Sequence, residues 1–292
     1  MMKERITILV RAIPEESKKY GHTVCVAGIT DSNEWRRLYP FRFRYGKTGL
    51  DFVKKDVIEA EVERNAKDAR KESRKVLSHA NLFSALSDDD ISARLDALLD
   101  TISGMESKGN SLCVVRPRIK DIDVEINDTN ILDPQKYLSS LSGGLEMREK
   151  VKMPVEVRYV FSCGGECCKN KPHKIIVIDW EINELARNLL RRYGDKAVVE
   201  GKMRQKLFDW MITRNVYFIM GTHFRFKTPM IIGIFYPQKH VSAKLPFQKY
   251  SSVQLFQYLE LLADAAFSRV FTDELSAERM KRAYVHLSRL WT

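Results

Sequence analysis

Three cysteines and one histidine lie within eleven positions in the middle of the chain, in the spacing C-x3-C-C-x4-H. Thiolate and imidazole groups are ligands that zinc prefers in proteins. Glycines between the first two cysteines allow the tight turn that a common centre requires. Because two adjacent side chains do not easily reach one ion, we expect only one of the neighbouring pair to bind the metal with the first cysteine and the histidine. The four residues are Cys163, Cys167, Cys168 and His173.

A set of three ligands leaves one coordination position open. His223, His240, Glu166 or a water molecule could fill it. Three protein ligands with an open position would form a catalytic site, whereas four would form a structural one. A cysteine-rich turn without metal and a redox-active dithiol are the alternatives. The pattern favours zinc, and we expect a structural role.

The segment "RRLYPFRFRYGK" (36–47) alternates basic and aromatic residues and contains no acid. In a strand, alternate residues share a face. Aromatic rings that face outward could stack on bases while the arginines hold phosphates, whereas rings that face inward would belong to the core. We expect the arginines to contact phosphates in either case. The candidates are Arg36, Arg37, Arg42 and Arg44 for phosphates, with Tyr39, Phe41 and Tyr45 for bases.

A second basic segment, "GTHFRFKTP" (221–229), directly follows an apolar strand. Its alternation places His223, Arg225 and Lys227 on one face, beside a turn where binding residues tend to collect. Arg225 and Lys227 are therefore further candidates for phosphate contacts. His223 could be a metal ligand, a proton carrier or a hydrogen-bonded turn residue.

Positive charge is concentrated in one part of the chain. The net charge is +11, and residues 201–250 hold nine lysines and arginines against a single acid, Asp209. The segment 87–100, by contrast, is acidic. Such asymmetry indicates a surface that meets a polyanion, which favours nucleic acid as the partner.

The composition favours a folded, soluble protein. Apolar residues make up 44% of the 292 residues, enough to build cores and to exclude global disorder. The apolar run near the N-terminus is too short for a signal peptide, and no run approaches the ~20 residues of a membrane span. We expect a cytoplasmic location without membrane contact, where clustered cysteines serve more often as ligands than as disulfides.

The periodicity predicts two strand-rich blocks. The predicted strands of the first block, 5–13, 22–30, 34–44 and 56–64, fit a small barrel or a meander sheet. Charged residues with leucine and alanine at helical spacing predict a helical connector over 66–104, with Gly104 ending a helix. The second block contains predicted strands at 111–126, 153–163 and 173–181, a helix over 181–194 and a hairpin of 214–226 with 229–237. Two helices are predicted after Ser251.

The evidence for an enzyme is weak. Asp179 and Glu181 could hold Mg²⁺, but a helix cap and the helix dipole explain both acids equally well. The sequence has no phosphate-binding glycine loop, dinucleotide fingerprint, nucleophile elbow or clear nuclease spacing. We therefore assign no catalytic residue.

Four stretches, "ILVRAIPEESKKYGHTVCVAGIT…EWRRLYPFRFR", "SLCVVRPRIKDI", "MPVEVRYVFSC…C…H…IDWEINEL" and "VYFIMGTHFRFKTPMIIGIFYP", resemble an uncharacterised prokaryotic family described as containing a dual OB-fold domain. The likeness covers roughly residues 5–238. It implies two small barrels in tandem and nucleic-acid binding, in genome-conflict or defence settings. Cys163, Cys168 and His173 match its cysteine and histidine positions, and the extra Cys167 leaves their register open.

We therefore expect an α+β protein with two tandem OB-like small β-barrels, a helical insertion and a helical C-terminal extension. The expected boundaries are 1–65, 66–108, 109–245 and 246–292. The expected function is nucleic-acid binding by basic strand faces, with zinc in the Cys/His loop. The alternatives are a metal-dependent nuclease or nucleic-acid-modifying enzyme and a protein-interaction subunit that uses the C-terminal helices.

Overall fold

The computed structural model describes residues 2–17, 21–42, 52–77, 80–127, 154–224 and 226–239. The chain divides into two compact units, Met1–Lys239 and His240–Thr292. The described residues all belong to the first unit, so the predicted C-terminal helices lie outside them. The fold is a mixture of α and β structure.

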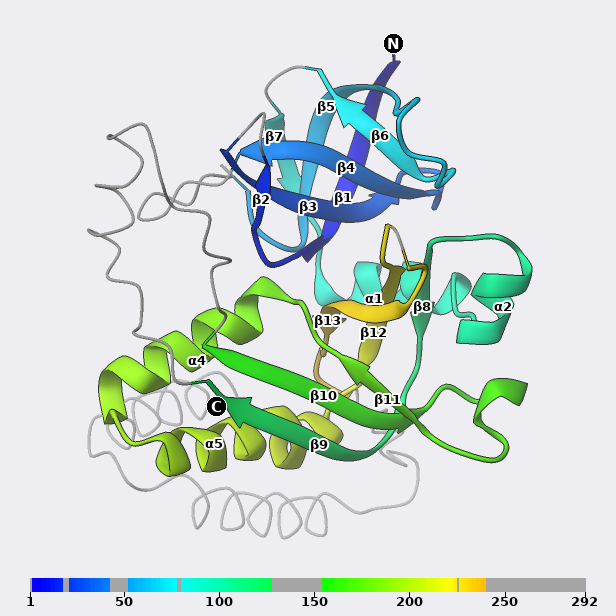
Figure 1. The fold of residues 1–292 in the computed structure, drawn as a ribbon. Coiled ribbons are helices and arrows are strands. Elements are labelled where there is room, and N and C mark those ends of the chain that lie inside the picture. Colours follow the sequence, from blue (N-terminus) through cyan, green and yellow to red (C-terminus); the bar gives the residue numbers. More distant parts are fainter. Residues whose placement is uncertain are drawn as a thin grey trace, which may run out of the picture. The chain divides into compact units, whose positions relative to one another are not determined.

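The N-terminal residues form a closed five-stranded barrel (Figure 1, blue to cyan). The strands are β1 (Met2–Arg11), β3 (Gly21–Thr30), β4 (Trp35–Arg42), β5 (Asp56–Arg64) and β6 (Ser73–Val76). Around the barrel their order is β1-β3-β4-β6-β5, and β5 pairs with β1 to close it. The β4–β6 pair is parallel and the other four pairs are antiparallel. Two further strands extend the sheet, β2 (Glu15–Ser17) on β3 and β7 (Asn81–Ala85) on β5.

The segment predicted to be a helical connector contains strands as well as helices. Residues 73–76 and 81–85 form β6 and β7, so the barrel extends well past residue 65. The error arose because these strands are short and charged or exposed, and pairing with β4 and β5 outweighed their weak helical pattern. Helices follow at α1 (Asp88–Ala97) and α2 (Ile102–Ser107), capped by Ser87 and Thr101. Gly104, expected to end a helix, lies inside α2.

The second part of the described chain contains two three-stranded sheets. One sheet has the order β11-β10-β9 and the other β13-β12-β8, and a single bridge between Val177 and Ile231 joins them. A second closed barrel is therefore not confirmed. No helix in the described ranges is both long and apolar enough to cross a bilayer. The strands are β8 (Leu112–Val115), β9 (Arg118–Ile126), β10 (Val155–Ser162), β11 (His173–Ile176), β12 (Tyr217–Thr222) and β13 (Pro229–Phe235). The helical elements are η1 (Glu166–Cys168), α4 (Trp180–Tyr193), α5 (Lys196–Arg204), η2 (Gln205–Trp210) and η3 (Met211–Thr213).

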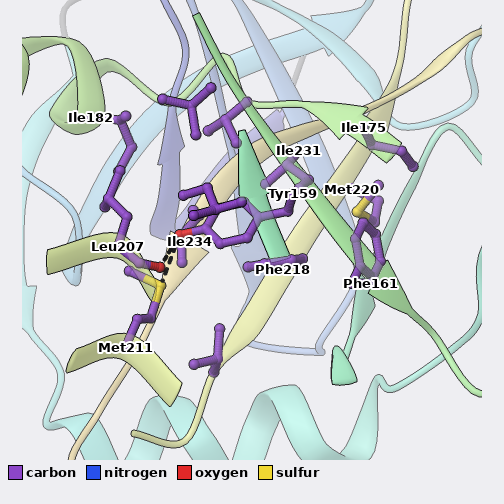
Figure 2. Close-up of a cluster of buried hydrophobic side chains, with 14 of the residues drawn as sticks. Tyr159, Phe161, Ile175, Ile182, Leu207, Met211, Phe218, Met220, Ile231 and Ile234 are labelled. Carbon is purple, nitrogen blue, oxygen red and sulfur yellow. Dashed lines mark hydrogen bonds between the residues drawn. The ribbon is translucent and has the colours of Figure 1, made fainter. Parts of the chain in front are cut away.

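The two sheets share a core that is built from alternate residues of β10. Tyr159 and Phe161 point inward from this strand, and both rings pack against Phe218 of β12 (Figure 2). The buried hydroxyl of Tyr159 donates to the carbonyl of Leu207 at 2.7 Å and lies 3.3 Å from the sulfur of Met211. A buried phenol needs such a partner. The bond fixes the η2 segment onto the sheet.

One buried carboxylate joins the barrel to the second part. Asp179 is 1% exposed. Its Oδ1 accepts a hydrogen bond from the backbone N–H of Glu181, and Asp179 thereby caps α4 as predicted. Its Oδ2 accepts from the backbone of Ile234 in β13 at 2.9 Å and from Nζ of Lys54 at 2.6 Å. Lys54 precedes β5 of the barrel. Burial lowers the pKa of Lys54, but the carboxylates of Asp179 and Glu181 outweigh this effect and raise it.

We predict that Asp179→Asn destabilises the protein by about 3–5 kcal/mol, because it leaves the ammonium of Lys54 buried without the one fully buried carboxylate that pairs with it. Urea unfolding followed by circular dichroism measures the loss. Glu181→Gln is the control. Its carboxylate also contacts Lys54, at 3.0 Å, but its side chain is 42% exposed, so the expected cost is at most about 1 kcal/mol. Equal costs for the two variants would contradict a special role for Asp179.

Candidate metal centre and nucleic-acid interface

The structure brings Cys163, Cys167, Cys168 and His173 together. Their ligand atoms all lie within 4.8 Å of one another, which makes this Cys3His group a possible metal site. Cys163 directly follows β10, His173 begins β11, and the short helix η1 between them carries the other two cysteines. The antiparallel pairing of β10 with β11 places Phe161 opposite His173 and so closes the loop at its base.

The donor atoms nearest to Cys163 lie close to the spacing of tetrahedral coordination. Cys163 Sγ lies 3.5 Å from Cys167 Sγ, 3.4 Å from Cys168 Sγ and 3.6 Å from His173 Nε2. Zinc–sulfur bonds of about 2.3 Å in a tetrahedron require sulfur–sulfur distances of about 3.8 Å. The three distances from Cys163 are within a few tenths of an ångström of the spacing around a tetrahedral ion, and every other pair of donor atoms lies within 4.8 Å.

Backbone groups around the sulfurs are arranged to receive negative charge. The N–H of Cys163 donates to Cys168 Sγ at 3.2 Å, and the N–H groups of Ile102 and Gly165 point at Cys163 Sγ. Burial raises the pKa of the Cys163 thiol to about 11. Burial also opposes ionisation of Cys168, but hydrogen bonds from Cys163 N–H and Ser162 outweigh it and lower the pKa of Cys168. Burial lowers the pKa of His173, which keeps its imidazole neutral and able to bind a metal.

Two glycines shape this loop. Gly164 has φ of +79°, a left-handed conformation that side chains disfavour. At Gly165, a Cβ atom would approach Cβ of Thr101 to 2.8 Å. The loop therefore lies directly against the beginning of α2.

The ligand set differs from the expected one. Both Cys167 and Cys168 belong to the group, since η1 curls the loop around the centre and brings both sulfurs within reach. His223, expected as a possible fourth ligand, is not one of the four. It lies after β12, where its ring stacks on Phe226 at 5.0 Å and its Nδ1 accepts from the backbone of that residue. The Glu166 carboxylate instead pairs with Lys169, and His240 lies outside the described residues.

Arg36 and Arg37 are buried rather than available to phosphates. The guanidinium of Arg36 donates to the carboxylates of Glu4 and Glu34. Arg37 donates to the backbone carbonyl of Ser111 at 3.1 Å. The structure therefore corrects the prediction that these two arginines contact phosphates, because groups within the protein already bind their guanidinium groups.

A bulge in β4 explains where the aromatic residues of that strand lie. The β3–β4 register shifts so that Leu38 and Phe41, three positions apart, both enter the barrel core. Phe41 packs edge-on against Phe52, and Tyr39 is partly buried, with its hydroxyl 3.4 Å from Thr23 Oγ1. Arg44 and Tyr45, and the side chain of Arg42, lie outside the described part of the chain.

The tip of the β12–β13 hairpin carries two exposed aromatic side chains that sequence reasoning missed. Phe224 is 57% exposed and Phe226 is 76% exposed. Lys227, a predicted contact, is exposed beside them with φ of +52°, and Arg225 lies outside the described residues. The sequence signal was the two phenylalanines themselves, which alternate with the basic residues. We call residues 223–228 the hairpin tip.

Internal hydrogen bonds and the barrel hold the hairpin tip in place. The backbone N–H of His223 donates to the carbonyl of Thr228, and that of Lys227 donates to the carbonyl of His223. Arg70, in the connection between β5 and β6, donates to the carbonyl of Thr222 at 3.1 Å. Its guanidinium also lies 5.4 Å from the ring of Phe224. The hairpin tip is thus held by specific contacts, and it lies against the loop between β5 and β6 of the barrel.

The acids considered for a catalytic metal have structural partners. Asp179 uses both oxygens in the contacts described above, and Glu181 contacts the same Lys54. Neither belongs to the Cys3His group.

The N-terminal and central parts of the chain match two family models. One, described as a domain of unknown function (DUF8758), matches residues 2–97, which include the whole barrel. No curated protein matches the chain. A solved structure of a murine DNA-binding protein bound to double-stranded DNA is similar, with 9% identity, coverage of 81% of this chain and 95% of that chain, and a TM-score of 0.29. The second family model, a domain of unknown function (DUF8757), matches residues 93–258, more than half of the chain. The chain therefore belongs to the DUF8757 family.

Proposed function

We propose that this protein binds single-stranded nucleic acid, with bases stacking on the hairpin tip and a structural zinc ion in the Cys3His loop. The observation that carries the proposal is the pair of exposed rings, Phe224 and Phe226, with the guanidinium of Arg70 beside Phe224 and the exposed Lys227 next to Phe226 in the chain. Large apolar side chains exposed together on a built surface mark an interaction site. Bases of a single strand offer their π-faces to such rings, whereas bases in a duplex are already stacked.

The barrel supports the same partner. We interpret it as an OB-type module, since it is a closed five-stranded barrel in which only β4 and β6 run parallel. OB-folds bind oligonucleotides with a sheet face and with the loops between strands one and two and between strands four and five. The β5–β6 connection is the second of these loops, and it holds Arg70 against the hairpin tip. Barrel loop and tip would then form one continuous binding surface.

The charge of the chain favours a polyanionic ligand. The net charge of +11 corresponds to a sequence pI of about 9.3. Cations near a binding surface raise both the affinity for phosphates and the rate of encounter. Lys227 and Arg70 provide such cations at the tip.

Zinc is the metal that fits the Cys3His group best. Soft thiolates and one imidazole at tetrahedral spacing select zinc among the common metals. Four protein ligands leave no position for a substrate, which makes the role structural. The bound ion would supply charge that stabilises the thiolates, while the chain contributes the N–H donors of Cys163, Ile102 and Gly165.

We predict that purified protein contains about one zinc per chain and that Cys163→Ser abolishes this content. Elemental analysis after dialysis measures it, and the thermal midpoint should fall when a chelator removes the ion. His223→Ala is the matched control, because His223 is outside the group and the variant should retain zinc. Zinc loss in the control but not in Cys163→Ser would contradict the assigned ligand set.

We predict that Phe226→Ala weakens binding of a labelled single-stranded oligonucleotide by about 1–3 kcal/mol, the usual contribution of one base–aromatic stack. Phe224→Ala should act in the same direction. Fluorescence anisotropy at low salt measures the affinity.

Phe83→Ala is the control for this experiment. Phe83 is 52% exposed on β7 and also contacts a cation, Arg5, but it lies outside the hairpin tip. It should leave affinity unchanged. If Phe83→Ala weakened oligonucleotide binding equally, the loss of affinity would not depend on the position of the phenylalanine. The hairpin tip would then not be the binding site.

A further inference from the structure

A row of cations and aromatic rings follows α5 and η2. The ammonium of Lys202 lies 4.7 Å from the ring centre of Tyr193. One turn further along, the ammonium of Lys206 and the guanidinium carbon of Arg214 lie 3.2 Å and 4.3 Å from the ring centre of Trp210. We call Lys202, Lys206, Trp210 and Arg214 the cationic stripe.

The cations of the stripe lack acidic partners within the described part of the chain. Lys202, Lys206 and Arg214 form no ion pair there, whereas the nearby Arg204 pairs with Asp121 at 2.7 Å. Burial and the charge of Arg214 lower the pKa of Lys206, as expected where two cations meet without an acid between them. The acid of the same segment, Asp209, is exposed. An anion between Lys206 and Arg214 would relieve their repulsion.

The stripe rests on a rigid base. The η2 segment is a π-helical turn, a rare geometry that occurs frequently at functional sites. The backbone carbonyl of Leu207 in η2 and the sulfur of Met211 in η3 both contact the hydroxyl of the buried Tyr159 (Figure 2). Trp210 packs edge-on against Tyr236 at 5.6 Å. The cations are thus held in place before a ligand arrives, which reduces the entropy lost on binding.

We propose that the cationic stripe binds phosphate groups of a nucleic-acid backbone, as a second contact separate from the hairpin tip. The inference rests on the proposed function. The two surfaces act differently, because at the tip the rings are exposed to bases, whereas at the stripe cations cover the ring of Trp210. The stripe therefore contributes electrostatic binding that is independent of base sequence.

The test compares four forms of the full chain: wild type, Lys206→Gln/Arg214→Gln, Phe224→Ala/Phe226→Ala, and the control Lys3→Gln/Lys108→Gln. The control removes the same amount of charge from two exposed lysines that are paired with Glu59 and Asp100. The probe is a fluorescein-labelled oligothymidylate, measured by anisotropy between about 0.05 and 0.2 M salt. Circular dichroism confirms that each variant is folded.

The stripe variant should lower the slope of log affinity against log salt by about 1.4, since each lost single-strand phosphate contact contributes about 0.7. Its affinity at the lowest salt should fall roughly tenfold or more. The control should change neither quantity. The tip variant should lose affinity with little change in slope.

Three results would overturn the inference. Wild-type binding with identical slopes for stripe variant and control would refute the stripe and leave the proposed function standing. No binding by the wild type at low salt would refute both. Tighter wild-type binding to phosphatidylserine vesicles than to the oligonucleotide, lost in the stripe variant, would assign the surface to a membrane instead.

Discussion

The buried carboxylate of Asp179 is the contact on which the arrangement of the described chain depends. It caps α4, accepts from the backbone of β13 and pairs with Lys54 of the barrel, and it does so from a position closed to water. A buried charge is tolerated only when such partners surround it. Three elements distant in sequence are therefore fixed to one group. The same hairpin that β13 anchors carries the exposed tip at its other end, where Arg70 reaches Thr222.

The Cys/His loop connects a different set of elements. It connects β10 to β11 and lies against α2, whose Ile102 points its N–H at Cys163. Sulfurs that receive backbone N–H groups are already organised for a cation. In the proposed function the Cys3His group has a structural role, and it shares no residue with the proposed binding surfaces. The proposed ion would in this way stabilise the second part of the described chain, where a second closed barrel is not confirmed.

Much of the local structure followed from sequence pattern. Alternation over 153–163 predicted a strand that the structure shows as β10, and the amphipathic run over 181–194 predicted α4, with Asp179 considered as its cap. The two apolar runs 214–226 and 229–237 predicted the hairpin of β12 and β13. The Cys/His spacing located the candidate metal group. These features depend on residues within one element or one turn, so the local sequence is enough to predict them. The helical interpretation of 66–85 was wrong because pairing partners far along the chain decide the state of short polar strands.

The sequence by itself therefore determined which residues could bind metal or phosphate, and the tertiary structure decided which of them are free to do so. Arg36 and Arg37 look like phosphate ligands in sequence, yet Glu4 and Ser111 from elsewhere in the chain occupy them. Phe41 enters the core because of a register shift, whereas Phe224 and Phe226 remain exposed on a hairpin tip. The physical reason is that residues distant in sequence determine which side chains are buried and which charges are paired. Local sequence patterns therefore do not predict either property.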